Sequence, residues 1–366
     1  MGENMSSVTG KNIQISLFGE SHGPLIGVTI NGIKPGIKLD IDYINKELEK
    51  RKAVGKISTP RKEKDKIEFV SGYFNGYTTG TPLTIIIKNE NTKSTDYEPS
   101  LLRPGHADYT AFLKYNGFQD YRGGGHFSGR LTAGIVIAGA ICKKILEDKG
   151  ILIGSHLKQI YNIKDLEFST ENEELKAQIE NLNNETFATI STQAKEKMIQ
   201  LIEKTKEEND SVGGIIETVI YNLQGGIGEP FFDSIESVLS SLIFSIPAVK
   251  GIEFGKGFDF VNAYGSQAND EFTYQEGIKT VTNNNGGVNG GISNGMPIIF
   301  KTVIKPTPSI SKKQNTVDYH HNQPTTIEIN GRHDPCIVHR ARVVVDSMCA
   351  IGILDLIIQK YGYEWM

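Results

Sequence analysis

Short runs of apolar residues along the chain predict strands. Helices are predicted where apolar residues recur at helical spacing and where a long segment is almost entirely apolar. The strands are predicted at residues 13–18, 26–30, 69–73, 83–87, 212–221 and 297–304. Apolar residues at helical spacing follow Asp40, which can cap that helix, and also follow Asp233 and Glu236, which resemble a capping box. Two apolar helices are expected, from residue 128 or 129 to about 148 and over 340–361.

Three polar stretches separate these elements. We expect residues 88–110 to be irregular, residues 311–324 to be mobile, and residues 160–210 to form surface helices and loops. Strands and helices interleave without a regular βαβ repeat, and neither GxGxxG after a strand nor GxxxxGK[ST] occurs. The pattern therefore predicts an α/β protein that is not a Rossmann fold.

Composition narrows the class of protein. The 366 residues carry a formal net charge of −4, which argues against a dedicated nucleic-acid binder. The three cysteines form no CxxC pair, so neither a disulfide framework nor a cysteine-rich zinc site is expected. The N-terminus lacks the pattern of a secretory signal, and the longest apolar stretch, 131–142, is too short to span a bilayer. We expect a cytoplasmic protein that does not bind membranes.

Glycine makes up 39 of 366 residues, well above the usual ~7%, and many glycines cluster beside histidine or arginine. His22 lies between glycines at the end of a predicted strand, where it can transfer protons near neutral pH. Arg103 and His106 share a loop fixed by Pro104 and Gly105. This pairing suits binding and protonation of a phosphate.

Three further segments carry candidate chemistry. Residues 121–130 run from three glycines into a helix, which favours an anion site. The basic stretch 50–66 can fold over a multiply charged ligand or be a solvated face. Residues 331–336 place Asp334 near Arg332. A metal site formed by His333, Cys336 and His339 is a weaker alternative, because it lacks carboxylates at the usual spacing, so we expect no metal.

Together these segments predict a site for a small, strongly anionic and phosphorylated ligand, with histidine for acid and base chemistry. The residue types alone do not reveal the reaction. The motifs, taken in order, resemble the chorismate synthase family. They are GESHG at 19–23, TTGTP at 78–82, RPGHADYT at 103–110, DYRGGG at 120–125, GGISNG at 290–295, KPTPS at 305–309 and GRHDPC at 331–336.

The resemblance implies a carbon–oxygen lyase that converts 5-enolpyruvylshikimate 3-phosphate to chorismate by 1,4-elimination of phosphate. This is the final step of the shikimate pathway, which leads to aromatic amino acids. The family requires reduced FMN although the reaction has no net redox change. NADPH is needed only if the chain has an intrinsic flavin reductase activity; otherwise an external flavin reductase is the expected partner. The family fold is a single-domain β-α-β sandwich, and its members are usually homotetramers.

The resemblance also implies roles for individual residues. The catalytic residues are Ser21, His22, His106 and Asp334. The substrate-binding residues are Arg51, Lys56, Arg61, Arg103, Arg130 and Arg332. The FMN contacts are His126, Phe127, Ser128, Pro247, Ala248, Gly290, Lys305, Pro306, Thr307, Pro308, Ser309 and Arg332. Residues 1–366 would form one domain, with active-site loops at 50–66, 88–127 and 305–336.

Two departures from the family pattern affect the expected flavin contacts. The family usually has Arg-Ser-Ser-Ala-Arg where this chain has residues 126–130, so His126 and Phe127 replace an arginine and a serine. KPTPS replaces the commoner KPTSS.

Two alternative functions remain. One is a flavin oxidoreductase that uses the same pocket, and the other is a non-catalytic sensor of a phosphorylated metabolite.

Overall fold

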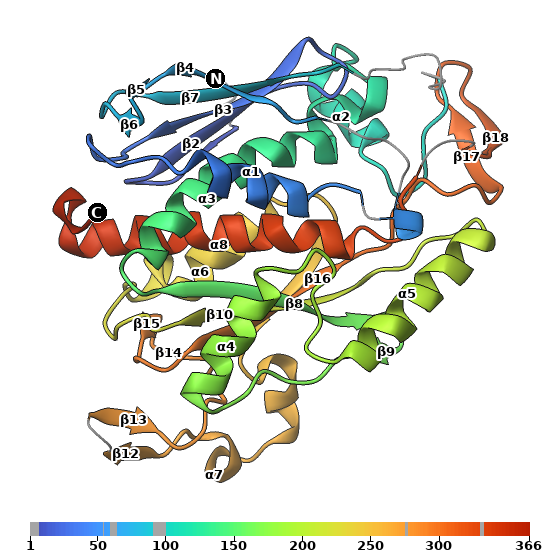
Figure 1. Cartoon of the computed structure of the whole chain (residues 1–366). Coiled ribbons are helices and arrows are strands. Elements are labelled where there is room, and N and C mark those ends of the chain that lie inside the picture. The colour runs from blue at the N-terminus through green and yellow to red at the C-terminus, as the bar shows by residue number, and fades with distance from the viewer. Residues whose placement is uncertain (1–6, 54, 59–63, 91–99, 275–276, 330–332) are drawn as a thin grey trace.

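The computed structural model describes residues 7–53, 55–58, 64–90, 100–274, 277–329 and 333–366. Its main elements form three layers, with two antiparallel sheets enclosing a layer of helices (Figure 1). One cluster of buried apolar side chains extends from Ile13 to Ile358. The single-domain organisation stays a prediction. No helix in the described ranges is long and apolar enough to cross a membrane.

The first sheet is built from the N-terminal part of the chain. Its strand order is β1 (Val8–Thr9), β2 (Gln14–Gly19), β3 (Leu25–Asn31), β7 (Leu83–Lys88) and β4 (Ile67–Ser71). Ile15 pairs with Ile30, and Val28 pairs with Ile85. These four side chains are fully buried, because alternate residues of a strand face the helix layer.

The second sheet lies on the other side of the helices. Its order is β11 (Val249–Phe254), β16 (Ile298–Ile304), β10 (Gly214–Tyr221), β8 (Leu152–Ile160) and β9 (Ile163–Lys164). Every neighbouring pair in both sheets is antiparallel. A Rossmann fold needs parallel strands. The predicted α/β sandwich that is not a Rossmann fold is therefore confirmed.

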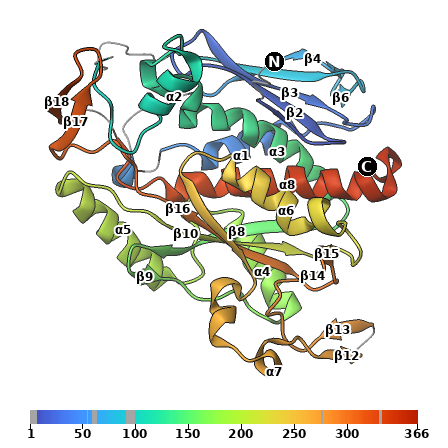
Figure 2. The same ribbon diagram turned by 180° about the vertical axis from the view of Figure 1, so that it is seen from behind.

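The helices between the sheets are visible from both sides of the molecule (Figures 1 and 2). They are α1 (Ile41–Lys50), α3 (Thr132–Glu147), α6 (Ile235–Phe244) and α8 (Val338–Tyr361). A Cβ added at Gly139 would lie 2.1 Å from the Cβ of Ser347, so α3 and α8 pack with their backbones close together. Nearly all of α8 is buried, which explains its long apolar run.

Smaller elements surround this sandwich. The remaining helices are α2 (Asp108–Tyr115), α4 (Asn172–Leu182), α5 (Thr192–Glu207) and α7 (Gly265–Ala268). The hairpins pair β5 (Tyr73–Phe74) with β6 (Tyr77–Thr78), β12 (Phe272–Tyr274) with β13 (Ile278–Thr280), β14 (Val288–Asn289) with β15 (Ile292–Ser293), and β17 (Gln314–Asp318) with β18 (Gln323–Ile327). The 3₁₀ turns are η1 (Gly55–Ile57), η2 (Arg122–Phe127), η3 (Gly129–Leu131), η4 (Phe231–Asp233), η5 (Gly257–Asn262) and η6 (Tyr363–Trp365).

The sequence predicted most of these elements and placed a few wrongly. Asp40 caps α1 as expected, since its carboxylate accepts a hydrogen bond from the backbone N of Tyr43 at 2.9 Å. The capping box at Asp233 is wrong, because Ser234 is the N-cap of α6 and accepts from the backbone N of Ser237 at 3.0 Å.

A segment expected to be mobile and another expected to be a loop both contain regular structure. The range 311–324 includes β17 and the start of β18, and the hairpin packs on residues 100–102, where Leu102 N donates to Val317 O at 3.4 Å. The loop range 88–127 contains α2, whose Phe112 ring lies 4.9 Å from that of Tyr319.

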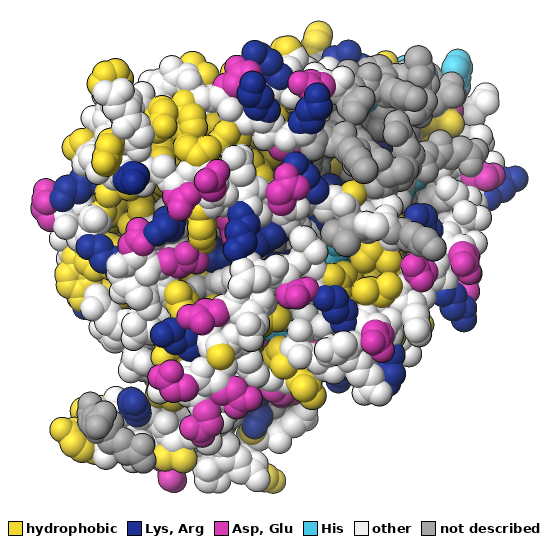
Figure 3. Space-filling view, viewed as in Figure 1, with side chains coloured by type: hydrophobic (Ala, Val, Ile, Leu, Met, Phe, Trp, Pro, Cys, Tyr) yellow, Lys and Arg dark blue, Asp and Glu magenta, His cyan; other side chains and the backbone are white. Residues whose placement is uncertain are grey.

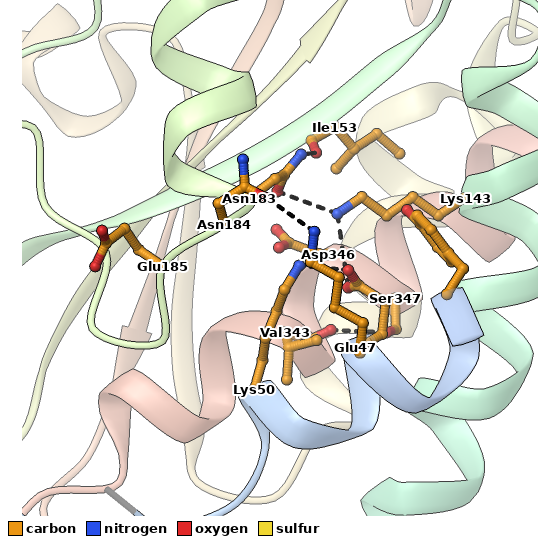
Figure 4. A network of polar contacts seen from close by, with 12 residues as sticks. Glu47, Lys50, Lys143, Ile153, Asn183, Asn184, Glu185, Val343, Asp346 and Ser347 are labelled. Atoms are coloured by element: carbon orange, nitrogen blue, oxygen red, sulfur yellow. Dashed lines mark hydrogen bonds and ion pairs between the residues drawn. The ribbon is translucent and has the colours of Figure 1, made fainter. Parts of the chain in front are cut away.

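A network of buried charges holds the helix layer together (Figure 4). Glu47 of α1 forms ion pairs with Lys50 and with Lys143 of α3, and the Lys143 Nζ donates to Asn183 Oδ1 at 3.1 Å. Burial, together with the nearby Lys143, lowers the pKa of Lys50 to about 8. Lys50 directly precedes Arg51, so this network also fixes the end of α1 where the candidate site begins.

Because the pKa of Lys50 is lowered, the free energy of unfolding should change with pH in the alkaline range. Between pH 8 and 10.5 the unfolded chain keeps the Lys50 proton that the folded protein releases, so the penalty for burying this charge falls and stability rises with pH. The raised pKa of Lys143 and the lowered pKa of Glu47 act mainly outside this window. The raised pKa values of Tyr43 and the three buried cysteines lower stability within it, so the test compares two proteins that share these groups. Denaturant unfolding should show wild type gaining about 1–3 kcal/mol relative to Lys50→Met between pH 7.5 and 10. Parallel curves for the two proteins would contradict this.

Candidate active site

The loop after β2 and the glycines at 123–125 meet at one place. Ser21 N donates to Gly125 O at 3.1 Å. A Cβ added at Gly123 would lie 2.6 Å from His22 Nε2 and 2.9 Å from Ser21 Oγ. Both Ser21 and His22 are buried. Because glycine has no Cβ, the backbone of this turn can pack directly against two of the predicted catalytic residues, Ser21 and His22.

The same turn reaches His106 from its other side. Gly123, Gly124 and Gly125 have φ values of 61°, 84° and 53°, a left-handed conformation that residues with a Cβ rarely adopt. A Cβ on Gly124 would lie 3.4 Å from His106 Cε1 and 3.5 Å from its Nε2. The structure therefore brings the predicted catalytic histidines to successive glycines of one turn.

Asp108, which the sequence reasoning missed, holds both His106 and Arg103. The His106 Nδ1 donates to Asp108 Oδ1 at 2.8 Å, and the Arg103 Nε and NH2 groups donate to the same carboxylate at 2.8 and 2.6 Å. Burial alone would raise the pKa of Asp108, but the hydrogen bonds from Arg103 and His106 hold it well below its usual range. With Nδ1 occupied, His106 turns Nε2 toward Gly124. The H-x-D spacing at the start of α2 was the available sequence signal.

Two of the predicted substrate arginines share a second missed carboxylate. Asp65 accepts from the Arg51 NH2 group at 3.1 Å and also from the Arg130 NH1 group. All three residues are buried. The C-terminal end of α1 and the start of α3 thus meet at one carboxylate.

Asp334 is paired with an arginine of α8. Its Oδ2 accepts from the Arg340 NH1 group, and the Arg340 Nε donates to Arg51 O at 2.8 Å. Burial and the neighbouring Arg103 lower the pKa of His333. The predicted base at residue 334 is therefore linked through Arg340 to the backbone of Arg51, one of the arginines held by Asp65.

The 305–309 segment joins this cluster through its lysine. Lys305 Nζ donates to Gly105 O at 2.5 Å, and Lys305 N donates to Ala248 O at 2.9 Å. Ala248 has a φ of 74°, unusual for a residue with a Cβ. A Cβ on Gly105 would lie 3.4 Å from Pro308 Cβ. Burial and nearby Lys250 lower the pKa of Lys305. Two groups of expected flavin contacts thus lie beside the 103–108 loop.

The segment that departs from the family pattern has other contacts. His126 Nδ1 donates to Gly19 O at 2.9 Å, and its Nε2 lies 2.8 Å from Ser7 Oγ. The Phe127 ring packs edge-on against Tyr115 with centroids 6.1 Å apart. Both ring nitrogens of His126 therefore hold the N-terminal strands. Its flavin contact stays a prediction.

Gly290 does not join the other predicted residues. It lies in the turn of the β14–β15 hairpin, whereas Lys305 follows the opposite end of β16. That strand alone spans roughly 23 Å at 3.3 Å per residue. The predicted ligands Arg61 and Arg332 lie outside the described residues, as does the side chain of Lys56. The roles assigned to the site residues stay predictions.

Comparison with known proteins decides the family. The family model described as chorismate synthase matches residues 13–358. The chain belongs to the chorismate synthase family. The resemblance drawn from the motifs is therefore confirmed, and the chain belongs to a family of lyases.

Three similar proteins illustrate the match to this family. Chorismate synthase of Thermococcus kodakarensis is 45% identical over 360 residues, covering 98% of this chain and 99% of that protein. Chorismate synthase of Pyrococcus abyssi is 46% identical, covering 97% of this chain and 98% of that protein. A crystal structure of a chorismate synthase matches with a TM-score of 0.76 and 29% identity, covering 97% of this chain and 94% of that one.

The left-handed turn gives a direct test of the site geometry. Gly123→Ala should lower the free energy of unfolding by about 1–3 kcal/mol, because its φ is unfavourable for alanine and its Cβ would meet His22. Gly129→Ala is the matched control, since a Cβ there meets no atom within 4 Å. Chemical denaturation should show the control unchanged or slightly stabilised; equal losses in both variants would refute the geometry.

Proposed function

We propose that the chain catalyses the 1,4-elimination of phosphate from 5-enolpyruvylshikimate 3-phosphate to give chorismate, the final step of the shikimate pathway. One observation supports this most strongly: in a member of the chorismate synthase family, His22 and His106 flank one glycine turn beside arginines held in fixed positions. The substrate carries one phosphate and two carboxylates, so it needs several cations. Arg51, Arg103 and Arg130 would bind these anions.

His106 would act as the general acid. Its Nδ1 is held by Asp108, which leaves Nε2 to give a proton to the departing phosphate oxygen. The C–O bond breaks and its electron pair leaves with the phosphate. The ring C–H bond breaks to form the second ring double bond, so the product is not oxidised overall. Asp334, with Ser21, would assist the removal of that hydrogen as a proton, and His22 would donate a proton to the bound flavin.

The family implies a flavin cofactor, and the site offers groups that suit one. Ser21 Oγ and Thr307 Oγ1 are buried without a hydrogen-bond partner among the described residues. Lys305 suits the flavin phosphate or its electron-rich ring edge. We propose reduced FMN, held by Ser21, His22 and the segments 126–128, 247–248 and 305–309; when bound, it supplies electron density to the substrate. An external flavin reductase would supply it reduced, and NADPH is needed only if the chain reduces its own flavin.

We further propose a cytoplasmic homotetramer. Several large apolar side chains around the β12–β13 hairpin project into solvent at the lower left of the molecule (Figure 3). Phe258, Phe272, Tyr274 and Ile278 are each at least 73% exposed. Exposed apolar patches of this kind mark interaction surfaces, and a second subunit could cover them. Gly290 lies at the opposite end of β16 from Lys305, so its expected flavin contact would be with the flavin of another subunit.

The proposed reaction is tested by an anaerobic assay. The protein is mixed with 5-enolpyruvylshikimate 3-phosphate and chemically reduced FMN, and phosphate release and chorismate absorbance are followed. We expect both products, with the flavin still reduced after turnover. Net oxidation of the flavin with reduction of the substrate would instead indicate an oxidoreductase. Substrate binding without product would indicate a sensor.

Substituting the two residues held by Asp108 separates their roles. His106→Ala should lower kcat about 10²–10⁴-fold with a small change in KM, because a proton donor acts mainly in the transition state. Arg103→Ala should raise KM as well, since an anion ligand also binds the ground state. Steady-state kinetics would contradict these roles if His106→Ala raised KM as much as Arg103→Ala.

A further inference from the structure

We propose that Asp65 is a positioning residue that sets the spacing of the two arginines that bind the substrate anions. The inference rests on the proposed function, because that function assigns substrate anions to Arg51 and Arg130. Neither the motifs nor the family resemblance singles out Asp65, which lies within the basic stretch 50–66, two residues before β4.

The contacts of Asp65 place it between the two guanidinium groups. Its Oδ2 accepts from the Arg51 NH2 group at 3.1 Å, and its Oδ1 accepts from the Arg130 NH1 group. The side chains of Asp65, Arg51 and Arg130 are 1%, 5% and 4% exposed. Asp65 also has a φ of 47°, which is unfavourable for aspartate and is kept only where surrounding contacts hold it. The carboxylate is therefore fixed, and each of its oxygens holds one arginine.

The carboxylate stays ionised in this position. Burial alone would raise the pKa of Asp65, but the Arg51 and Arg130 guanidiniums outweigh burial and lower it. Replacing the carboxylate by a neutral amide would leave buried guanidiniums less well compensated, and such groups move to find other partners. Asp65 therefore fixes the positions of the two arginines before substrate binds. Binding then costs less conformational entropy, because these side chains are already ordered.

Asn89 extends this positioning to the catalytic loop. Its Oδ1 accepts from the Arg130 Nε at 3.1 Å, while its Nδ2 donates to Glu20 O at 3.0 Å and Gly23 O at 2.8 Å. These two carbonyls flank Ser21 and His22 in the chain. Arg130 is thus held by Asp65 on one side and is linked on the other to the loop that carries a predicted catalytic histidine.

The same network reaches Asp334 through Arg51. The Arg340 Nε donates to Arg51 O at 2.8 Å, and the Arg340 NH1 group pairs with Asp334. Among the described residues, the contacts that join Asp65 to these groups run through the arginines. It does not act on the substrate directly, so its loss should affect substrate binding more than the chemical step.

The experiment compares Asp65→Asn with a matched control, Asp165→Asn. The Asp165 side chain is equally buried and accepts from His156 Nδ1 at 2.8 Å and from two backbone N–H groups, but it lies on the second sheet beside β9. Asp65→Asn should raise KM for 5-enolpyruvylshikimate 3-phosphate about tenfold or more while kcat changes less than about threefold. Asp165→Asn should leave KM unchanged, even if it lowers stability.

Calorimetric titration with inorganic phosphate tests Asp65 without turnover. Asp65→Asn should weaken phosphate binding about fivefold or more, because a mispositioned guanidinium loses a charge-assisted hydrogen bond. Unchanged or tighter binding by the folded variant would overturn the proposal, as would a wild type that binds no phosphate. If Asp65→Asn does not fold, Asn89→Ala must raise the phosphate Kd in its place; an unchanged Kd overturns the proposal.

These two readouts separate the failure of the inference from the failure of the proposed function. A wild type that binds phosphate but makes no chorismate would refute the proposed reaction, while the phosphate comparison would still decide the role of Asp65. A wild type that makes chorismate, with KM unchanged in Asp65→Asn, would refute only the positioning role.

Discussion

The approach of the 123–125 turn to the two histidines is the constraint on which the rest of the site depends. Three successive left-handed residues let the backbone pass close to His22 and His106, and side chains at the first two positions would crowd them. The turn also directs the chain into α3, which packs against α8 in the centre of the molecule. The three glycines therefore both contact the predicted catalytic histidines and lead directly into a helix of the core.

Buried and half-buried carboxylates fix the cations around this turn. Asp65 holds two arginines, Asp108 holds Arg103 together with His106, and Asp334 pairs with Arg340. Burying such charges is costly unless each is paired, so the pairs restrict the side chains to few conformations. Cations held in this way can stabilise developing negative charge with little reorganisation, which suits the departure of a phosphate.

Local patterns in the sequence predicted the site motifs and most strands and helices, whereas the layered sandwich was implied by the resemblance to the family. Asp40 could be recognised as a cap from its own neighbours, whereas the cap of α6 was misplaced by one residue because Asp233 and Ser234 are both cap-forming types. Asp65 and Asp108 could not be assigned, since a carboxylate gains its role from partners that only the tertiary structure supplies. The hairpin in 311–324 was missed because its strands are polar and are stabilised by residues 100–102.

The central claim is that one set of residues binds the substrate anions and protonates the leaving phosphate. A crystal structure with 5-enolpyruvylshikimate 3-phosphate and oxidised FMN tests it most directly. We expect one phosphate oxygen within about 3.2 Å of His106 Nε2, with Nδ1 still bound to Asp108, and another phosphate oxygen on Arg51 or Arg130. Substrate bound away from the 123–125 turn, or with its phosphate remote from His106, would contradict the account.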